Sequence, residues 1–380
     1  MRNTFVALVP LVSLIAAALA GANPAHAQSN STIYGIVDVF GQYVDGASRV
    51  VRVQSGGRNG SRLGFRGTED LGDGFKAIYT LEMGLNIDDG TFGQGGVAFG
   101  RQAFIGLKDW WGEATLGRQQ SSLYYLTTDY SAFGNVAHGA STAVIGGFAG
   151  GYEPVRGGSA TAVPPAAGAT GNTSPARINN SIRYASPTWN GLRGTVLLGL
   201  GETAGGTKDN RIIDLSARYT KGPFDATLAY LSDKRNITPG TPNTLADTTT
   251  VALAGSYDFD GGYKLLGGFM SVDDKRPENQ DGRGYWLGGE YHFGSNTVRA
   301  QWVRNDPRYG ESNKTNALGV GYQYDFSKRT AVYSAVTRFQ NGANAGTGGL
   351  GRFNGPIPVG LTTAGNNNLT EVTAGIRHSF

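Results

Sequence analysis

Residues 75–86 read FKAIYTLEMGLN, with an apolar or aromatic residue at every odd position and mostly polar or small residues at the even positions. Because successive side chains of a β-strand point to opposite faces, this alternation predicts a strand with one apolar face and one polar face. The same period recurs in residues 250–259, 284–293 and 318–326. The chain is therefore expected to be all-β.

Sixteen such segments follow one another along the chain, joined by seven short turns and eight long connections. The longest connection covers residues 120–179, and residues 45–60 are expected to form another long loop. Short turns at one rim and long loops at the other are typical of outer-membrane barrels. We therefore predict a single 16-stranded antiparallel transmembrane β-barrel. Its strands should begin near Thr32, Ser61, Gly74, Gly100, Glu113, Asn180, Gly191, Arg211, Pro223, Thr249, Gly262, Arg283, Asn296, Thr315, Lys328 and Thr370.

The first residues have the pattern of a cleaved export signal. A positive start at Arg2 precedes a mostly apolar stretch, and Ala25-His26-Ala27 is a small-x-small cleavage site. We expect residues 1–27 to be a signal peptide and residues 28–380 to form the barrel. The mature chain would then have 353 residues, the 380 of the sequence less the 27 of the leader.

The composition argues against several classes of protein. The formal net charge of +4 is too small to suggest a nucleic-acid-binding protein. The chain has no cysteine for a disulfide or a thiolate metal site, and no cofactor is expected. After the leader there is no apolar run of about 18 residues, which argues against helical membrane spans. Two acidic loop pairs, at residues 88–89 and 273–274, could bind Ca²⁺ weakly, although such exposed acids are more often simply solvated.

The polar face of the strands carries full charges. A charged side chain facing lipid near the middle of the bilayer would cost about 2–4 kcal/mol, so this face is expected to line a lumen. A soluble β-sandwich could show the same two faces, but it rarely has so many strands with this rhythm of loops. A barrel of this size leaves an aqueous channel. The pore-lining residues predicted in this way are Arg66, Lys76, Glu82, Arg183, Arg218, Glu290, Arg299 and Arg377.

Several motifs, in their order along the chain, resemble those of the trimeric general porins of Gram-negative bacteria. STIYGIVD at 31–38 resembles the family's first strand, and SRLGFRGTEDLG at 61–72 its second strand and first turn. GRQAFIGL at 100–107 and LGRQ at 116–119 are similar to strands four and five, and the terminal Phe380 resembles an assembly signal. The resemblance implies a general diffusion channel for ions and small hydrophilic solutes in the outer membrane. It also implies a homotrimer, surrounded by lipid and lipopolysaccharide and inserted by the barrel-assembly machinery.

In that family the third loop folds inward and narrows each pore. The resemblance implies that Arg62 and Arg101 lie on the basic wall of this constriction with Arg118 beside them, and that Asp129 is an acidic group on the loop. The family's Pro-Glu-Phe-Gly stretch appears here as SAFG, residues 131–134, without the carboxylate. Because rings of charge set ion preference, the basic wall should dominate, and we expect a weak preference for anions.

Other functions remain open beside this one. A substrate-selective sugar or organic-acid channel would need an aromatic lining, for which Tyr124, Tyr125, Tyr130 and Phe133 are candidates. A barrel adhesin or enzyme would use its long loops. The four histidines have no nearby Ser/Asp pattern, and no Cys/His cluster suggests zinc, so no catalytic residue is expected.

Overall fold

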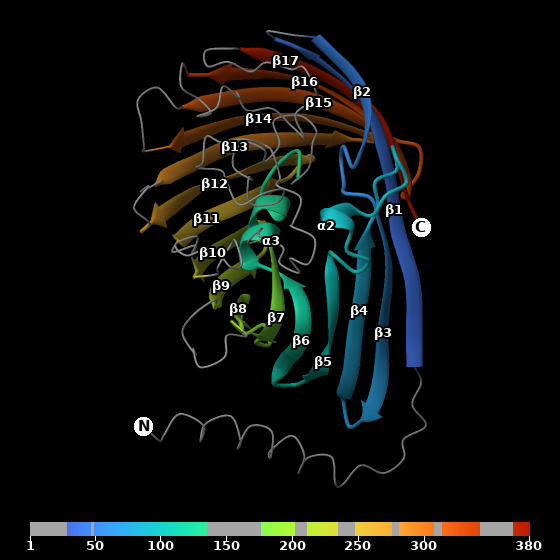
Figure 1. Ribbon diagram of the computed structural model, residues 1–380, viewed down its shortest axis with the longest axis vertical. Coiled ribbons are helices and arrows are strands. Elements are labelled where there is room, and N and C mark those ends of the chain that lie inside the picture. The colour runs from blue at the N-terminus through green and yellow to red at the C-terminus, as the bar shows by residue number, and fades with distance from the viewer. Residues whose placement is uncertain are drawn as a thin grey trace.

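The computed structural model describes residues 29–46, 49–134, 176–201, 211–234, 248–275, 281–307, 314–342 and 368–380. Within them the chain is mostly β-strand (Figure 1). The strands are β1 (Ser29–Asp45), β2 (Arg49–Ser55), β3 (Arg62–Gly72), β4 (Phe75–Gly84), β5 (Gln102–Asp109), β6 (Gly112–Gln120), β7 (Arg177–Ala185), β8 (Leu192–Gly199), β9 (Ile212–Lys221), β10 (Phe224–Asp233), β11 (Thr248–Phe259), β12 (Tyr263–Asp274), β13 (Gly282–Phe293), β14 (Asn296–Pro307), β15 (Thr315–Asp325), β16 (Thr330–Asn341) and β17 (Leu369–Ser379). The helices in these ranges are α2 (Gly93–Gly96) and α3 (Ser122–Asp129). The leader and its cleavage site lie outside the described residues.

The strands form one closed antiparallel ring. Each strand from β3 to β17 pairs with the next, and β1 closes the ring by pairing with β17 on one side and with β2 and β3 on the other. Closure removes the free edge that an open sheet would expose to lipid. The predicted barrel of sixteen antiparallel strands is confirmed, because β2 and β3 share one strand position.

The expectation of a long loop at residues 45–60 is wrong for much of that stretch. β2 pairs with the second half of β1, and β3 pairs with the first half. Residues 56–61 therefore interrupt one long strand instead of forming part of an outer loop. β2 has only seven residues and is followed by a glycine-rich run, so its alternation could not be distinguished from a loop in the sequence. It forms a strand because β1 is long enough to pair with it.

The outer face of the barrel is apolar. Large side chains that alternation turns outward are exposed along the strands, as for Ile105, Leu253 and Leu318 at 62%, 54% and 55%. Aromatic residues gather near the short turns, where the rings of Tyr263 and Tyr291 stack with their centroids 4.3 Å apart. An apolar band with an aromatic girdle matches a surface that faces lipid.

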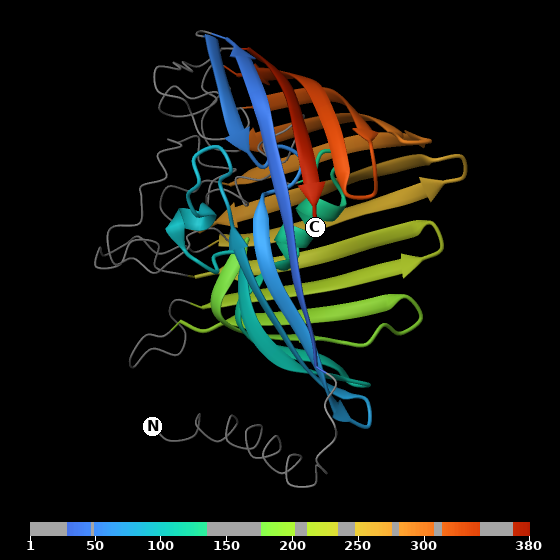
Figure 2. The same cartoon turned by 90° about the vertical axis from the view of Figure 1, so that its right-hand side faces the viewer.

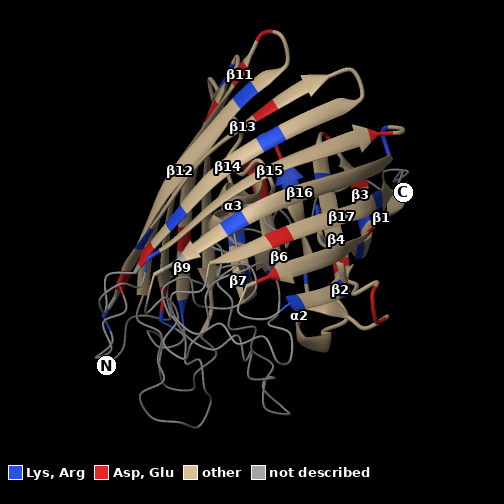
Figure 3. Cartoon of the chain, turned by 90° about the horizontal axis from the view of Figure 1, so that it is seen from above, with Lys and Arg blue, Asp and Glu red and all other residues tan. Residues whose placement is uncertain are grey.

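The inner face carries the charges. Figure 3 shows Lys, Arg, Asp and Glu as isolated bands on strands that are otherwise uncharged. These inward groups pair with one another across neighbouring strands, as where Gln42 of β1 donates to the carboxylate of Glu371 of β17 at 2.8 Å. The polar face predicted from the sequence is therefore a hydrogen-bonded lining and not a second surface toward lipid.

The start of the longest connection packs against the inside of this wall. α3 contacts β9, β10 and β11, and Figures 1 and 2 both place it within the ring of strands. Trp286 of β13 donates its indole N–H to the carbonyl of Tyr130 at 2.6 Å, and Gln301 of β14 accepts from the N–H of Ala132 at 2.8 Å. Residues 135–175 of this connection lie outside the described residues. In the part of the chain that is described, no helix has the length and apolar character needed to cross a membrane.

The last residue completes the closing seam. The N–H of Phe380 donates to the carbonyl of Gly35, and the N–H of Gly35 donates to the carbonyl of Phe380, both at 3.1 Å. The aromatic ring lies so close that a Cβ atom at Gly35 would be 2.4 Å from a ring carbon. Glycine at this position of β1 lets the C-terminal ring lie against the strand.

Candidate functional site

A carboxylate on the inner wall organises a cluster of arginines. Glu82 is an inward residue of β4, and its side chain is 4% exposed. One of its oxygens accepts from Arg101 Nε at 2.7 Å. The other accepts from the Tyr34 hydroxyl at 2.9 Å and lies 3.8 Å from Arg62 Nη1. Glu82 therefore offsets part of the charge of two arginines and holds Arg101 through a short charge-assisted hydrogen bond.

Tyr124 of α3 meets the same cluster from the lumen. Ser121 caps this helix by accepting from the N–H of Tyr124 at 3.3 Å. The Tyr124 hydroxyl accepts from Arg101 Nη2 at 3.0 Å, and the Arg177 guanidinium lies 5.3 Å from the centre of its ring. Burial alone would raise the pKa of Tyr124, but three neighbouring arginines, Arg101 foremost, hold it below the ordinary value. The phenol therefore senses a positive potential.

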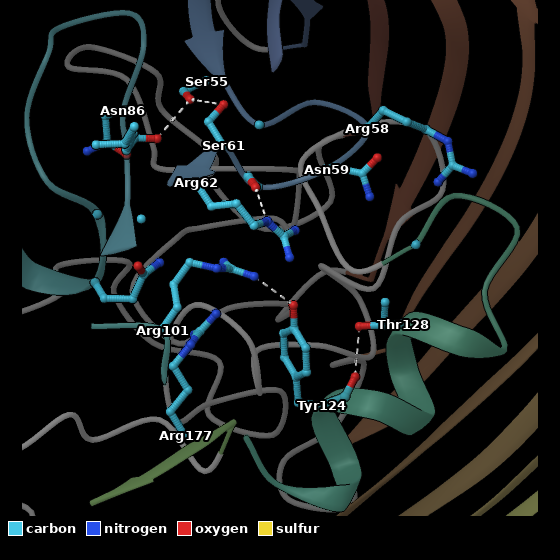
Figure 4. Close-up of a pocket in the computed structure, with 17 residues that line it drawn as sticks. Ser55, Arg58, Asn59, Ser61, Arg62, Asn86, Arg101, Tyr124, Thr128 and Arg177 are labelled. Carbon is cyan, nitrogen blue, oxygen red and sulfur yellow. Dashed lines mark hydrogen bonds between the residues drawn. The ribbon is translucent and has the colours of Figure 1, made fainter. Parts of the chain in front are cut away.

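These side chains line a cavity of about 380 Å³ between the strand break at 56–61 and α3. Figure 4 shows Arg62, Arg101 and Arg177 converging on the space around Tyr124, with Arg58 farther away. Four of the lining residues are arginines, and none is an aspartate or a glutamate. The full lining consists of Ser55, Gly56, Arg58, Asn59, Gly60, Ser61, Arg62, Gly84, Leu85, Asn86, Gly93, Gln94, Arg101, Tyr124, Thr128, Gly134 and Arg177.

Among the described residues, the lining of this cavity carries only positive charge. Four arginines line the cavity, whereas the nearby Glu82 is covered by its own partners. Arginine stays protonated at any working pH, and low-dielectric walls focus the field of such groups into the lumen. The arrangement can therefore attract and orient small anions, as charged rings do in other selective pores.

Of the residues predicted for the constriction, the structure brings Arg62 and Arg101 together. Arg118 does not line the cavity. Its Nε donates to the carbonyl of Gly100 at 2.8 Å, and another of its nitrogens donates to Asn179. Strand alternation places Arg118 on the same face as Leu116, which is exposed on the outside of the wall.

Asp129, predicted as the acidic group of the loop, belongs to a different cluster. Its carboxylate accepts from Arg218 Nη1 at 2.8 Å, and Arg218 also pairs with Asp225 at 2.5 Å. Burial raises the pKa of Asp129, and the charge of Arg218 opposes that rise. Asp129 therefore does not face Arg62 and Arg101 across the cavity.

The eight residues predicted to line the pore lie on the inward face by strand register. Arg183 pairs with Glu113 at 2.8 Å, and Arg299 pairs with Glu290 at 3.4 Å. The Arg66 guanidinium lies 4.9 Å from the ring centre of Tyr34. Their role in conduction stays a prediction. The register neighbours of the eight are Thr32 for Arg66, Asp70 for Lys76, Gly64 for Glu82, Thr115 for Arg183, Thr227 for Arg218 and Asp38 for Arg377, and Glu290 and Arg299 are neighbours of each other.

Two arginines of the cavity were missed by the sequence reasoning. Arg58 lies in GGRNG, residues 56–60, whose composition indicates a loop. Arg177 follows a Gly/Ala/Pro-rich segment, and an irregularity near Asn180, with φ 49°, shifts the pairing between Arg183 and Arg177. Period-two alternation therefore could not assign the face of Arg177.

Across the described ranges, no three or more His, Cys, Asp or Glu side chains are grouped so that they could hold a metal ion. At the suggested weak Ca²⁺ position, an oxygen of Asp89 accepts from the N–H and the hydroxyl of Thr91, at 2.9 Å and 2.7 Å. This carboxylate therefore stabilises its own turn.

Comparison with known proteins gives matches over nearly the whole chain. A family model described as Gram-negative porin matches residues 13–344. Outer membrane porin protein 32 of Delftia acidovorans is 33% identical over 382 residues, covering 97% of this chain and 99% of its own. An outer membrane porin protein of Bordetella pertussis is 30% identical over 398 residues, with 84% of this chain and 92% of its own covered. The solved structure of an anion-selective porin from Comamonas acidovorans superposes with a TM-score of 0.71 at 28% identity, over 93% of this chain and 100% of that one.

Proposed function

This chain belongs to the Gram-negative porin family, and from that premise we propose that it forms a water-filled diffusion channel of the outer membrane that prefers anions. The observation that carries the preference is the cavity lined by four arginines and no carboxylate. The description of the Comamonas acidovorans porin as anion-selective agrees with it. Arg62, Arg101 and Arg177 would form the basic wall of the narrow part, and α3 the opposite wall.

Two measurements test this function. In planar bilayers under a KCl gradient, the reversal potential should have the sign of chloride preference. In liposome swelling, neutral solutes of increasing size should enter more and more slowly, without saturation at high concentration. A reversal potential of the opposite sign would contradict the anion preference, and saturation with neutral solutes would contradict general diffusion.

A substrate-selective channel is the second candidate, and the cavity favours organic acids over sugars as its solute. Of the four aromatic residues considered for a sugar path, Tyr124 lines the cavity, and Tyr130 and Phe133 are 1% and 0% exposed and pack against the wall. Tyr125 is 40% exposed but does not line this cavity. Guanidinium groups pair well with carboxylates. Flux of a small dicarboxylate that saturates, while flux of a sugar of similar size does not, would favour this candidate.

The channel is proposed to act without chemical conversion of its solutes, since its relatives from Delftia acidovorans and Bordetella pertussis are porins. We further propose a homotrimer, inserted by the barrel-assembly machinery among lipid and lipopolysaccharide. Ile33 and Val37 of β1, 63% and 37% exposed, give an apolar outer surface that lipid or a second copy can cover. Light scattering in mild detergent should give the mass of three chains, and the mass of one chain would contradict the trimer.

Removal of residues 1–27 is also proposed. The support is the sequence itself, in which a positive start and an apolar stretch precede the small-x-small site Ala25-His26-Ala27. N-terminal sequencing of protein from the outer membrane should read from Gln28. Retention of Met1 in that fraction would contradict the cut.

A further inference from the structure

We propose that Arg58 is a further specificity-determining residue of the pore and that Asp38 is the residue that positions it. The proposal rests on the channel function proposed above. Arg58 lies in the break between β2 and β3, and both Arg58 and four of its neighbours in residues 56–61 line the arginine cavity. In Figure 4 it extends away from the other three arginines, so its charge acts on a different part of the cavity.

Asp38 of β1 holds this break by its carboxylate. One oxygen accepts from the N–H of Gly57 at 3.0 Å, and the other accepts from the N–H groups of Arg58 and Asn59 at 3.0 Å and 2.7 Å. The hydroxyl of Tyr333, on β16, donates to the same carboxylate. Asp38 is 0% exposed, so its charge is taken up by these donors and not presented to the lumen.

The backbone of Asp38 binds the first and last residues of the same segment, Gly56 and Ser61. Its carbonyl accepts from the N–H of Gly56 at 2.8 Å and from the hydroxyl of Ser61 at 2.9 Å. Its N–H donates to the Ser61 hydroxyl oxygen at 3.0 Å. Both ends of the six-residue break are therefore tied to one residue of β1.

The sequence of the break suits this arrangement. Gly56 has φ +79°, a conformation that L side chains rarely adopt. A Cβ atom at Gly57 would lie 2.1 Å from the Tyr333 hydroxyl oxygen and 2.7 Å from a ring carbon of Phe40. Glycine at these two positions lets the chain leave the strand and approach the Asp38 carboxylate closely.

The break also links Arg58 to the cluster around Glu82. Arg58 Nε donates to Gln323 of β15 at 3.4 Å, across the lumen face of the wall. Two residues further on, the carbonyl of Gly60 accepts from Arg62 Nε at 2.9 Å. A shift of this segment would therefore move Arg58 directly and would disturb Arg62 through the Gly60 carbonyl.

The test is a double-mutant cycle read by reversal potential in planar bilayers under a KCl gradient. Arg58→Gln removes the charge, and we expect the chloride-to-potassium permeability ratio to fall roughly two-fold. The same substitution is then made in an Asp38→Asn background, where asparagine offers one acceptor oxygen and no charge. If Asp38 positions Arg58, the effect of Arg58→Gln becomes smaller in that background. Loss of the Asp38 charge by itself changes the permeability ratio, but this change is present both with and without Arg58→Gln. It therefore cancels when the effects of Arg58→Gln in the two backgrounds are compared.

Arg49→Gln is the matched control, because Arg49 lies on the same β1–β2 hairpin but is 76% exposed and pairs with Asp45. Its permeability ratio should equal that of the wild type. An Arg58→Gln ratio equal to that of the control overturns the role of Arg58, and equal effects in both backgrounds overturn the role of Asp38. If Asp38→Asn does not assemble, Tyr333→Phe, which removes one donor to the Asp38 carboxylate, serves as the second background. Arg58→Gln should then change the permeability ratio less in Tyr333→Phe than in the wild type. Equal changes in these two backgrounds would overturn the role of Asp38. A wild-type channel that prefers cations would refute the proposed function separately, since the Arg58 effect is a difference from the wild type.

Discussion

Asp214 of β9 accepts two hydrogen bonds from Ser122, the first residue of α3, one from its N–H at 2.7 Å and one from its hydroxyl. The first N–H groups of a helix have no partner within it, and the helix dipole favours an anion at that end. A buried carboxylate of the wall thus anchors the segment that faces the arginine cavity. Asp38 does the same for residues 56–61, so two wall aspartates hold the two inward segments.

Asp214→Asn should loosen α3. Asparagine keeps one acceptor oxygen and loses the charge, and weakening a buried hydrogen bond of this kind costs about 1–3 kcal/mol. We expect larger current noise and a higher single-channel conductance, together with a lower temperature for heat modification on gels. Asp258→Asn is the control and should behave as the wild type, because Asp258 is an exposed residue near the end of β11 that pairs with Lys264 at 3.4 Å. Unchanged conductance and noise in Asp214→Asn would mean that the other contacts of α3 suffice.

Arg62→Gln combined with Arg177→Gln should weaken the anion preference while the barrel still assembles. Both side chains line the cavity. Arg101 lines the cavity as well, but it is left in place because it holds the buried Glu82 at 2.7 Å, whereas Arg62 lies 3.8 Å from that carboxylate. Reversal of Arg101 to glutamate would place two carboxylates together and endanger folding. The reversal potential in a salt gradient should move toward zero. Because arginine stays protonated, the difference from the wild type should not change from neutral pH upward. It should shrink near 1 M salt, where screening acts within about 3 Å. A selectivity equal to that of the wild type at 0.1 M salt would remove these residues from the selective region.

Acid should strengthen the anion preference through Asp129. Burial raises the pKa of this carboxyl, so its protonation begins at a higher pH than for an ordinary aspartate near 3.9. Protonation removes a negative charge beside Arg218 and leaves that arginine less compensated. Asp129→Asn should therefore be more anion-selective than the wild type at neutral pH. The two should converge as the pH falls and Asp129 takes up its proton, and a gap that persists below the ordinary aspartate pKa would contradict the assignment.

Phe380→Ala should reduce outer-membrane levels far more than it reduces stability. The ring is 48% exposed, so its loss removes only part of the roughly 1.5–3 kcal/mol that full burial of a phenylalanine contributes, and the two backbone bonds to Gly35 remain. Refolding in detergent should be close to that of the wild type. Phe326→Ala, which removes another aromatic at the short-turn rim, controls for loss of interfacial packing. Equal outer-membrane levels for both variants would argue against a recognition role for Phe380.

The barrel itself was determined by the sequence. In residues 75–86 and their counterparts, the period of two assigns each side chain to one of two faces, and a charge facing lipid is too costly for the faces to be exchanged. Strand number, antiparallel order and the inward direction of Glu82 follow from that local pattern. Alternation also turns Arg62 inward, whereas Arg101 precedes β5 with the parity of the outward Ile105 and was placed by the family resemblance alone.

The composition of the arginine cavity was decided only by the tertiary structure. Residues 56–61 enter the lumen because Asp38 supplies the acceptors for their N–H groups, and no local pattern links a residue of β1 to a glycine-rich stretch that follows the next strand. Asp129 turns to Arg218 because α3 is anchored at Asp214, on a strand far away in the sequence. Alternation along a strand reports which face a side chain occupies. Which groups then meet across the lumen depends on hydrogen bonds between segments that come together only when the ring closes.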